Sequence, residues 1–247
     1  RCIFLDSIAR ADQLGYVADL CKPKVWLSGE RGFVMGKGQP ALEAIPIKIN
    51  MGPCTKTWTA RFEELLETPE AAEPVPVEQE HTALITFTTG SSGTPKGADR
   101  SHRFLAAQHY AIDACLPYEK SDLDLPVFPI FSLNNLAAGV TTILPAINVA
   151  EPADNDPYVL YTQITGESIT TLTLNPSLLN GLNKYCLEKG KTLPGLRRVA
   201  AGGAAVSRDV VEEFTKIAPN AELVVMYGST EAEPMTHITV VVGDREA

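Results

Sequence analysis

The chain has 247 residues, of which 45% are hydrophobic, so it can bury a core; this excludes a disordered segment or a small disulfide-stapled fold. Its 21 Lys and Arg and 30 Asp and Glu give a formal net charge of −9, which disfavours non-specific binding to nucleic acid or anionic membranes and favours a small-molecule partner. The five cysteines are odd in number, widely spaced and without a CxxC pair, so we expect reduced thiols and a cytoplasmic location.

The first part of the chain alternates between helical and strand patterns. An amphipathic stretch over residues 8–20 predicts a helix, and short apolar runs over 24–29 and 44–50 predict strands. Residues 58–67, WTARFEELLE, again have helical spacing. The acidic, proline-rich residues 68–80 predict an exposed connector, whose role as a domain boundary stays open.

Residues 83–97, ALITFTTGSSGTPKG, carry the strongest local signal, an apolar strand that runs into a glycine-rich loop. Glycines let backbone N–H groups turn inward as a nest, hydroxyl groups add donors, and Lys96 adds a positive charge, so the loop suits a phosphate. The alternative is a flexible surface turn. The loop is not a Walker motif, because Pro95 stands where glycine is needed and Gly97 where Ser or Thr is needed.

The second half predicts a regular succession of strands and helices. No membrane span is expected, because the most apolar long stretch, residues 136–150, contains threonines, a proline and an asparagine. Helix-start signals at Asn175-Pro176 and Ser207 and stop signals at Gly190 and Pro219 delimit two helices. In chain order we predict a strand over 169–175, a helix over 176–189, a strand over 196–201, a helix over 208–218 and a strand over 222–226.

This succession favours a parallel sheet covered by helices on its faces. In open sheets of that kind, ligands bind outside the carboxyl ends of the strands. Three polar, glycine-bearing segments stand where predicted strands end, namely Thr88–Gly97, Gly202–Ala205 and Tyr227–Glu231. We therefore expect these three segments to converge around one anionic ligand.

The loop resembles the phosphate-binding signature of adenylate-forming enzymes, the superfamily of acyl-CoA synthetases, firefly luciferases and nonribosomal peptide adenylation domains. Residues 196–207, LRRVAAGGAAVS, resemble the family's strand and glycine turn along the adenine, and VVMYGSTEAEP resembles its YGxTE motif. Residues 128–145 look like its acyl-pocket helix and following strand, so the likeness covers nearly the whole chain. The loop positions that match are Ile85, Thr88, Thr89, Gly90, Ser91, Ser92, Gly93, Pro95 and Lys96, followed by Ser101-His102.

The resemblance implies an α/β fold of largely parallel sheets flanked by helices, as in the N-terminal domain of adenylate-forming enzymes. It implies that residues 1–247 are a truncated N-terminal adenylation domain, without the C-terminal lid domain and its lysine or the later aspartate that holds the ribose. The start without Met agrees with a fragment, which we expect to be inactive by itself. The implied reaction is ATP-dependent activation of a carboxylic acid to an acyl-adenylate, usually followed by thioester formation with CoA.

The resemblance also assigns roles to individual residues. Lys96, Thr230 and Glu231 are the expected catalytic residues, and Glu231 and Thr88 are the expected ligands of Mg²⁺, which takes few protein carboxylates beside nucleotide phosphates. Tyr227 is expected to stack on adenine; alone, it reads as a core tyrosine at a strand end, and Glu231 as a solvated charge. The expected ATP-binding residues are Thr88, Thr89, Gly90, Ser91, Ser92, Gly93, Lys96, Gly202, Gly203, Ala204, Tyr227, Gly228 and Thr230.

The acid is the least defined partner. Family members usually carry a histidine in the acyl-pocket segment, where this chain has Ser132, so the acid is expected to be positioned differently. The pocket segment is apolar, through Phe131, Leu133 and Leu136 among others, and has no acidic residue to meet an α-amino group, which favours a fatty or aryl acid. Ordinary core packing explains the same segment equally well.

Three hypotheses follow. The first is an acyl-adenylating ligase similar to acyl-CoA synthetases, the second a nucleotide-binding module without turnover, and the third an α/β scaffold whose glycine loops are only turns. His81, His109 and His237 have no ligand spacing with one another or with the cysteines, and no Ser-His-Asp grouping is present, so covalent catalysis is not indicated. The pattern does not determine the oligomeric state.

Overall fold

The computed structural model describes residues 1–5, 10–52, 59–67, 73–88, 94–149 and 154–240. The chain divides into two compact units, residues 1–102 and 103–247. In the described ranges, no helix combines the length and the apolar character needed to cross a membrane.

The first unit begins with a small α/β layer. Its parallel sheet has the order β2 (Val25–Ser28), β3 (Ile47–Asn50) and β4 (Ala60–Arg61). Both predicted strands over 24–29 and 44–50 are thereby confirmed. A small core joins Ala18, Leu42 and Ile45, with Trp26 packed against them. The helices of this layer are α1 (Ala11–Cys21), α2 (Glu30–Met35), α3 (Pro40–Glu43) and α4 (Phe62–Leu66).

Two of these helices differ from their predicted bounds. The helix predicted over 8–20 is α1, which begins at Ala11; residues 6–9 lie outside the described ranges. The helix predicted over 58–67 begins only at Phe62, because Ala60 pairs with Ile49 as the edge of the sheet. Strand pairing here overrides the local helical spacing.

The first unit also contains a second sheet of three strands. β1 (Cys2–Phe4) runs parallel to β5 (Thr82–Thr88), which pairs with β6 (Lys96–Ser101) as an antiparallel hairpin. Residues 73–80, the described part of the proline-rich segment, are exposed and precede β5 within the same unit. The boundary between the units therefore falls after His102 and not in this segment.

The second unit is built around one six-stranded sheet. Its strands have the order β12-β11-β10-β9-β7-β8 and run parallel except for β12, which is antiparallel to its neighbour. This confirms the predicted α/β fold of mostly parallel sheets. The strands are β7 (Leu123–Pro126), β8 (Thr141–Thr142), β9 (Thr171–Leu174), β10 (Arg198–Ala201), β11 (Glu222–Ser229) and β12 (Ala232–Val240).

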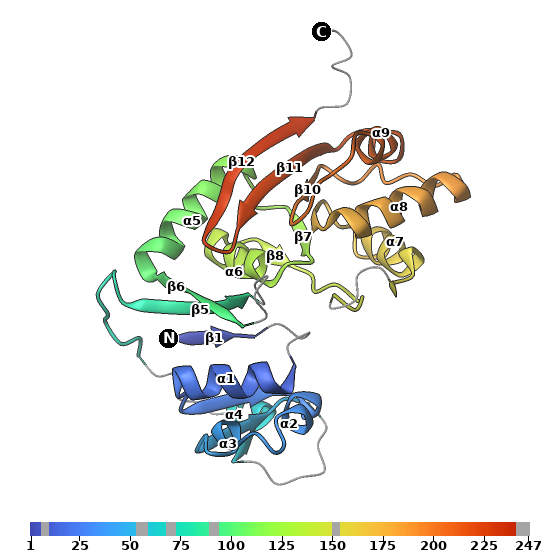
Figure 1. The fold of residues 1–247 in the computed structure, drawn as a ribbon. Helices are drawn as coiled ribbons and strands as arrows, with labels where there is room; N and C mark the ends of the chain where they lie inside the picture. Colours follow the sequence, from blue (N-terminus) through green and yellow to red (C-terminus); the bar gives the residue numbers. More distant parts are fainter. Residues whose placement is uncertain (6–9, 53–58, 68–72, 89–93, 150–153, 241–247) are drawn as a thin grey trace. The chain divides into compact units, whose positions relative to one another are not determined.

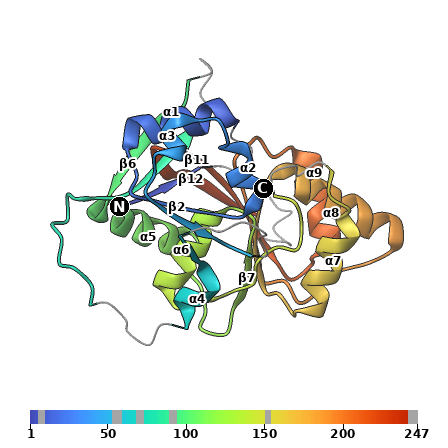
Figure 2. The ribbon, with the colours of Figure 1, turned by 90° about the horizontal axis from the view of Figure 1, so that it is seen from below.

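Helices cover both faces of this sheet. In Figures 1 and 2, α5 and α6 lie on one face and α7, α8 and α9 on the other. The pleat explains the two layers: Val199 and Ala201 pack in the larger core beneath α7–α9, whereas Ala200 between them packs in the smaller core with α5 and α6. The helices are α5 (His102–Cys115), α6 (Pro129–Ala138), α7 (Pro157–Gly166), α8 (Pro176–Lys189) and α9 (Arg208–Ile217).

The two helices predicted from capping signals begin and end close to the predicted residues. Asn175 Oδ1 accepts a hydrogen bond from the Leu178 amide at 2.8 Å, and the Ser207 side chain accepts one from the Val210 amide. Gly190, with φ of 59°, ends α8 in the left-handed conformation that glycine adopts without strain. Hydrogen bonds between residues close together in the chain thus mark where these helices begin and end.

A buried polar network ties α6 to the sheet. Asp124 on β7 is fully buried, and its carboxylate accepts hydrogen bonds from Asn135 Nδ2 of α6 at 2.7 Å and from Thr171 Oγ1 of β9 at 2.6 Å. Asn135 Nδ2 also donates to Thr142 Oγ1 of β8 at 3.0 Å. Burial raises the pKa of Asp124 to about 6, although the hydrogen bonds oppose this shift.

Candidate functional site

A recess opens in the second unit where β9, β10 and β11 end. It is small and partly open to solvent, with about 60 Å³ of space that a water-sized molecule can occupy. Both glycine-bearing segments of this unit contribute to its wall. The lining residues are Phe128, Phe131, Thr173, Ala200, Ala201, Gly202, Gly203, Met226, Tyr227, Gly228, Glu233 and Pro234.

The turn after β10 favours glycine at both positions. A Cβ atom on Gly202 would lie 3.0 Å from the backbone oxygen of Met226, a tight contact that favours glycine where β10 approaches the end of β11. Gly203 has φ of 84°, and a Cβ atom there would lie 3.3 Å from the Phe128 ring. The hollow beside this turn therefore depends on the missing side chains, which suits close approach of a flat ligand.

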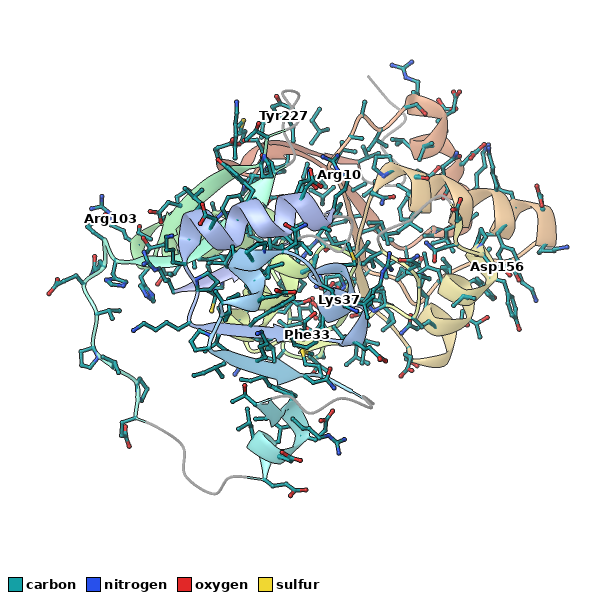
Figure 3. The ribbon with its side chains drawn as sticks, turned by 60° about the horizontal axis from the view of Figure 1, so that its bottom comes forward. Arg10, Phe33, Lys37, Arg103, Asp156 and Tyr227 are labelled. Atoms are coloured by element: carbon teal, nitrogen blue, oxygen red, sulfur yellow. The ribbon has the colours of Figure 1, made fainter. Side chains whose placement is uncertain are left out.

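Tyr227 stands at the rim of the recess. The strand β11 extends to Ser229, beyond the predicted end at Met226, because β12 pairs with it and continues the ladder. The Tyr227 side chain is 66% exposed, so it is not a core tyrosine (Figure 3). Next to it, a Cβ atom on Gly228 would lie 3.1 Å from the Ala232 oxygen, a tight contact that favours glycine there as well.

Thr230 and Glu231 form the turn of the β11–β12 hairpin, just beyond the recess. Glu231 is exposed and Thr230 is half-buried. Among the described residues, no group of three His, Cys, Asp or Glu side chains could hold a metal ion by itself. A single exposed carboxylate fits Mg²⁺ that arrives with nucleotide phosphates, which supply the other oxygen ligands.

The phosphate-loop residues belong to the first unit. Thr88 ends β5 and Lys96 begins β6, directly opposite each other in the ladder, and Lys96 is exposed. Thr89, Gly90, Ser91, Ser92 and Gly93 lie outside the described residues. Gly202, Gly203, Tyr227 and Gly228 thus lie together at the recess, and Ala204 is exposed just after the turn. Thr88 and Lys96 form a cross-strand pair within the first unit.

The segment over residues 128–145, predicted as the acyl pocket, borders this recess only in part. It forms α6 and β8, as expected, and Phe131 lines the recess. Leu133 and Leu136 do not line it, and Leu136 is 75% exposed. Ser132 is half-buried and also lies outside the lining set.

Sequence reasoning missed several lining residues. Met226 and Thr173 read as ordinary strand positions, and nothing local distinguishes them from core residues. Phe128 directly precedes α6 within FPIFS, and Glu233 follows Glu231 by two residues within TEAEP. These two motifs were the sequence features from which Phe128 and Glu233 could have been assigned to the site. Glu233 is the one carboxylate among the residues that line the recess.

Comparison with known proteins identifies the family. The sequence profile described as "AMP-binding enzyme" matches residues 1–247, the whole chain. The chain therefore belongs to the AMP-binding, or adenylate-forming, enzyme superfamily.

The names of the relatives indicate different products. An olefin beta-lactone synthetase of Stenotrophomonas maltophilia is 36% identical over 157 residues, covering 63% of this chain and 28% of that protein. A long-chain-fatty-acid–CoA ligase of Thermus thermophilus is 33% identical over 178 residues, covering 70% and 32%. A luciferase-like enzyme from the mealworm Zophobas morio matches the fold with a TM-score of 0.79 at 19% identity, covering 95% of this chain and 55% of that one. The matches thus span about a third or less of these two curated relatives.

Proposed function

We propose that the chain carries the nucleotide and acid sites of a ligase that uses ATP to convert a carboxylic acid into an acyl-adenylate and pyrophosphate. The observation that carries this proposal is the recess at which two separate motifs meet, the Gly202-Gly203 turn and Tyr227-Gly228. An exposed aromatic ring beside a glycine-walled hollow suits a flat base, and the exposed Glu231 follows within four residues.

In the proposed reaction, a carboxylate oxygen of the acid attacks the α-phosphorus of ATP, and pyrophosphate leaves. No protein nucleophile is needed, so the chain's task is to hold two anions in line and to offset their repulsion. Lys96 supplies a positive charge for the phosphates, Thr88 a hydroxyl donor, and Tyr227 a surface for adenine. Mg²⁺, when bound through Glu231, would neutralise charge on the phosphates.

The fate of the acyl-adenylate separates two candidate functions. In the first, the thiol of CoA attacks the acyl carbon, AMP leaves and a thioester forms; the likeness to a long-chain-fatty-acid–CoA ligase favours it. In the second, a hydroxyl group of the acid itself attacks the acyl carbon, AMP leaves, the hydroxyl proton is released and a lactone closes. The higher identity to an olefin beta-lactone synthetase favours this second route.

Pyrophosphate exchange on the complete polypeptide that contains this sequence tests the proposal. Labelled pyrophosphate should enter ATP only when a suitable carboxylic acid is present, and Glu231→Gln should reduce the exchange by at least about tenfold. Glu212→Gln, which removes an exposed charge from α9, is the matched control and should leave exchange unchanged. Nucleotide binding without exchange for any acid would instead support the module without turnover, and absence of binding would support the simple scaffold.

A further inference from the structure

The helix α6 contributes to the wall of the recess, and a buried asparagine ties this helix to the sheet. Phe131 lies on α6 and Phe128 directly precedes it, and both residues line the recess. Asn135 follows Phe131 by four residues, which places the two side chains on one face of the helix. Asn135 Nδ2 donates to Asp124 Oδ2 at 2.7 Å and to Thr142 Oγ1 at 3.0 Å. The position of Phe131 in the recess therefore depends on where Asn135 is held.

The Asn135 side chain is attached to the sheet through its donor atom. Its other polar atom, Oδ1, is buried and has no hydrogen-bond partner within the part of the chain that the structure describes. Turning the amide over would direct Oδ1 at the Asp124 carboxylate, where two acceptors would repel each other. Asp124 therefore sets the orientation of the amide. A negative charge on Asp124 also strengthens the bond, because charge-assisted hydrogen bonds are roughly twice as strong as neutral ones.

Neutral donors surround the Asp124 carboxylate. Beside Asn135, it accepts hydrogen bonds from Thr171 Oγ1 at 2.6 Å and from the Tyr118 hydroxyl at 3.5 Å. Within the described ranges, no lysine or arginine forms an ion pair with Asp124. A buried carboxylate without a cation lowers stability, and burial accordingly raises the pKa of Asp124 to about 6. Stabilisation of the fold at neutral pH therefore does not explain a carboxylate at this position.

The other titratable groups near Asp124 keep their charge states around pH 6. Tyr118 keeps its proton, because burial and the Asp124 charge raise the pKa of its hydroxyl. Asp122 forms an ion pair with Arg197, and Arg198 forms one with a glutamate of β11. The side chains that face Asp124 from α6, β8 and β9 do not titrate; they are Asn135, Thr142 and Thr171. The charge of this network therefore changes at Asp124.

We infer that Asp124 is a positioning residue: through Asn135 it holds α6, and with it Phe131, in the arrangement that binds the nucleotide. The inference rests on the proposed function, since it takes the adenine base to occupy the recess. The ionised carboxylate holds Asn135 more firmly than the neutral acid does, so the nucleotide-bound state favours the ionised form. By linkage, the affinity for the nucleotide should increase as the pH rises to about 6 and then level off.

This pH dependence distinguishes positioning from a purely structural role. Ionisation of Asp124 lowers the stability of the fold but should raise the affinity, so the two quantities move in opposite directions. If Asp124 acted only through the stability of the fold, the affinity would fall together with the free energy of unfolding as the pH rises.

Calorimetric titration of the complete polypeptide with adenosine tests the inference, because adenosine has no phosphate group that would itself titrate. From about pH 5 to about pH 7, wild-type affinity should increase roughly three- to tenfold. Asp124→Asn should bind as wild type does at the lower pH and show no increase, although at about pH 7 it should be at least as stable. Asp113→Asn, which removes an exposed carboxylate from α5, is the control and should keep the increase.

Hydrogen exchange and pyrophosphate exchange separate this inference from the proposed function. Without ligand at about pH 7, the α6 amides should exchange at least roughly threefold faster in Asp124→Asn than in wild type, and the α8 amides should exchange equally. The predicted adenosine binding without pyrophosphate exchange would remove the ligase function and keep the inference. Equal α6 exchange, a wild-type affinity that does not change with pH, or an increase that Asp124→Asn retains would each overturn the inference.

Discussion

Thr88 and Lys96 lie directly opposite each other in the β5–β6 ladder. Their backbones are therefore held roughly 5 Å apart, the spacing of paired residues in an antiparallel sheet. Strand pairing consequently fixes the backbones of Thr88 and Lys96, and the Lys96 side chain is exposed. The Lys96 side chain can therefore move to contact a phosphate while its backbone stays paired in the sheet.

Gly203→Ala should damage the recess, whereas Gly139→Ala should only strain the backbone. Both glycines have positive φ, 84° and 70°, so each substitution should lower the free energy of unfolding by about 1–2 kcal/mol. A Cβ atom on Gly203 also meets Phe128 at 3.3 Å, whereas one on Gly139 meets nothing within 4 Å. Urea denaturation measures the shared loss of stability, and calorimetry with AMP should detect weaker binding for Gly203→Ala alone.

Equal AMP binding by these two alanine variants would contradict this reading of the recess. It would mean that the close approach of Gly203 to Phe128 affects only packing and not the binding of AMP.

Removing the Tyr227 ring should weaken AMP binding without unfolding the protein. Stacking on a base contributes about 1–3 kcal/mol, so Tyr227→Ala should lower AMP affinity by roughly 5- to 150-fold. Tyr227→Phe keeps the ring and should stay within about threefold of wild type. Tyr110→Ala, which removes a similarly exposed ring from α5, is the control and should bind AMP as wild type does. Loss of binding in the Phe variant would assign the contact to the hydroxyl group instead.

Asp124 should make the protein less stable as the pH rises. Its pKa is about 6 in the folded chain against an ordinary value of 3.8, so between these values the folded state holds a proton that the unfolded state releases. The stabilising contribution is complete at lower pH and is lost as the pH rises from about 4 through about 6, on the order of 3 kcal/mol in total.

Denaturation of wild type and Asp124→Asn across about pH 4 to 7 isolates this effect. The stability advantage of wild type over the variant should shrink with rising pH. Asp122 contributes with the opposite sign: burial acts to raise its pKa, but hydrogen bonds from Arg197, the Glu119 amide and Thr170 lower it. The informative quantity is therefore the difference in the free energy of unfolding between wild type and Asp124→Asn. If this difference does not change with pH, Asp124 keeps an ordinary pKa.

The parts of the fold that depend on local signals could be predicted. The ends of α8 and α9 follow from Asn175, Gly190 and Ser207, whose side chains or backbone freedom act within a few residues. The strand β12 was not predicted, because it exists through its antiparallel pairing with β11. Asp124 was not recognised as buried, because an aspartate in a short strand indicates burial only when its partners, Asn135 and Thr171, are known.

The candidate site, too, could be predicted where local motifs determine it and not where it depends on strand pairing. Gly202, Gly203, Tyr227 and Gly228 were predicted from motif spacing and lie together at the recess. Glu233 was not predicted, because its place depends on a bulge in strand pairing. The expected convergence of the phosphate loop with these residues stays a prediction, since Lys96 belongs to the other compact unit.

Calorimetry of ATP and AMP binding to Lys96→Ala and Tyr227→Ala tests that convergence most directly. If one nucleotide contacts both residues, Tyr227→Ala should weaken ATP and AMP alike, whereas Lys96→Ala should weaken ATP by roughly tenfold or more and AMP much less, because the lysine meets the outer phosphates. Lys120→Ala, a lysine of the second unit, is the matched control. Unchanged ATP binding by Lys96→Ala would contradict the account, because the glycine-rich loop would then take no part in binding the nucleotide.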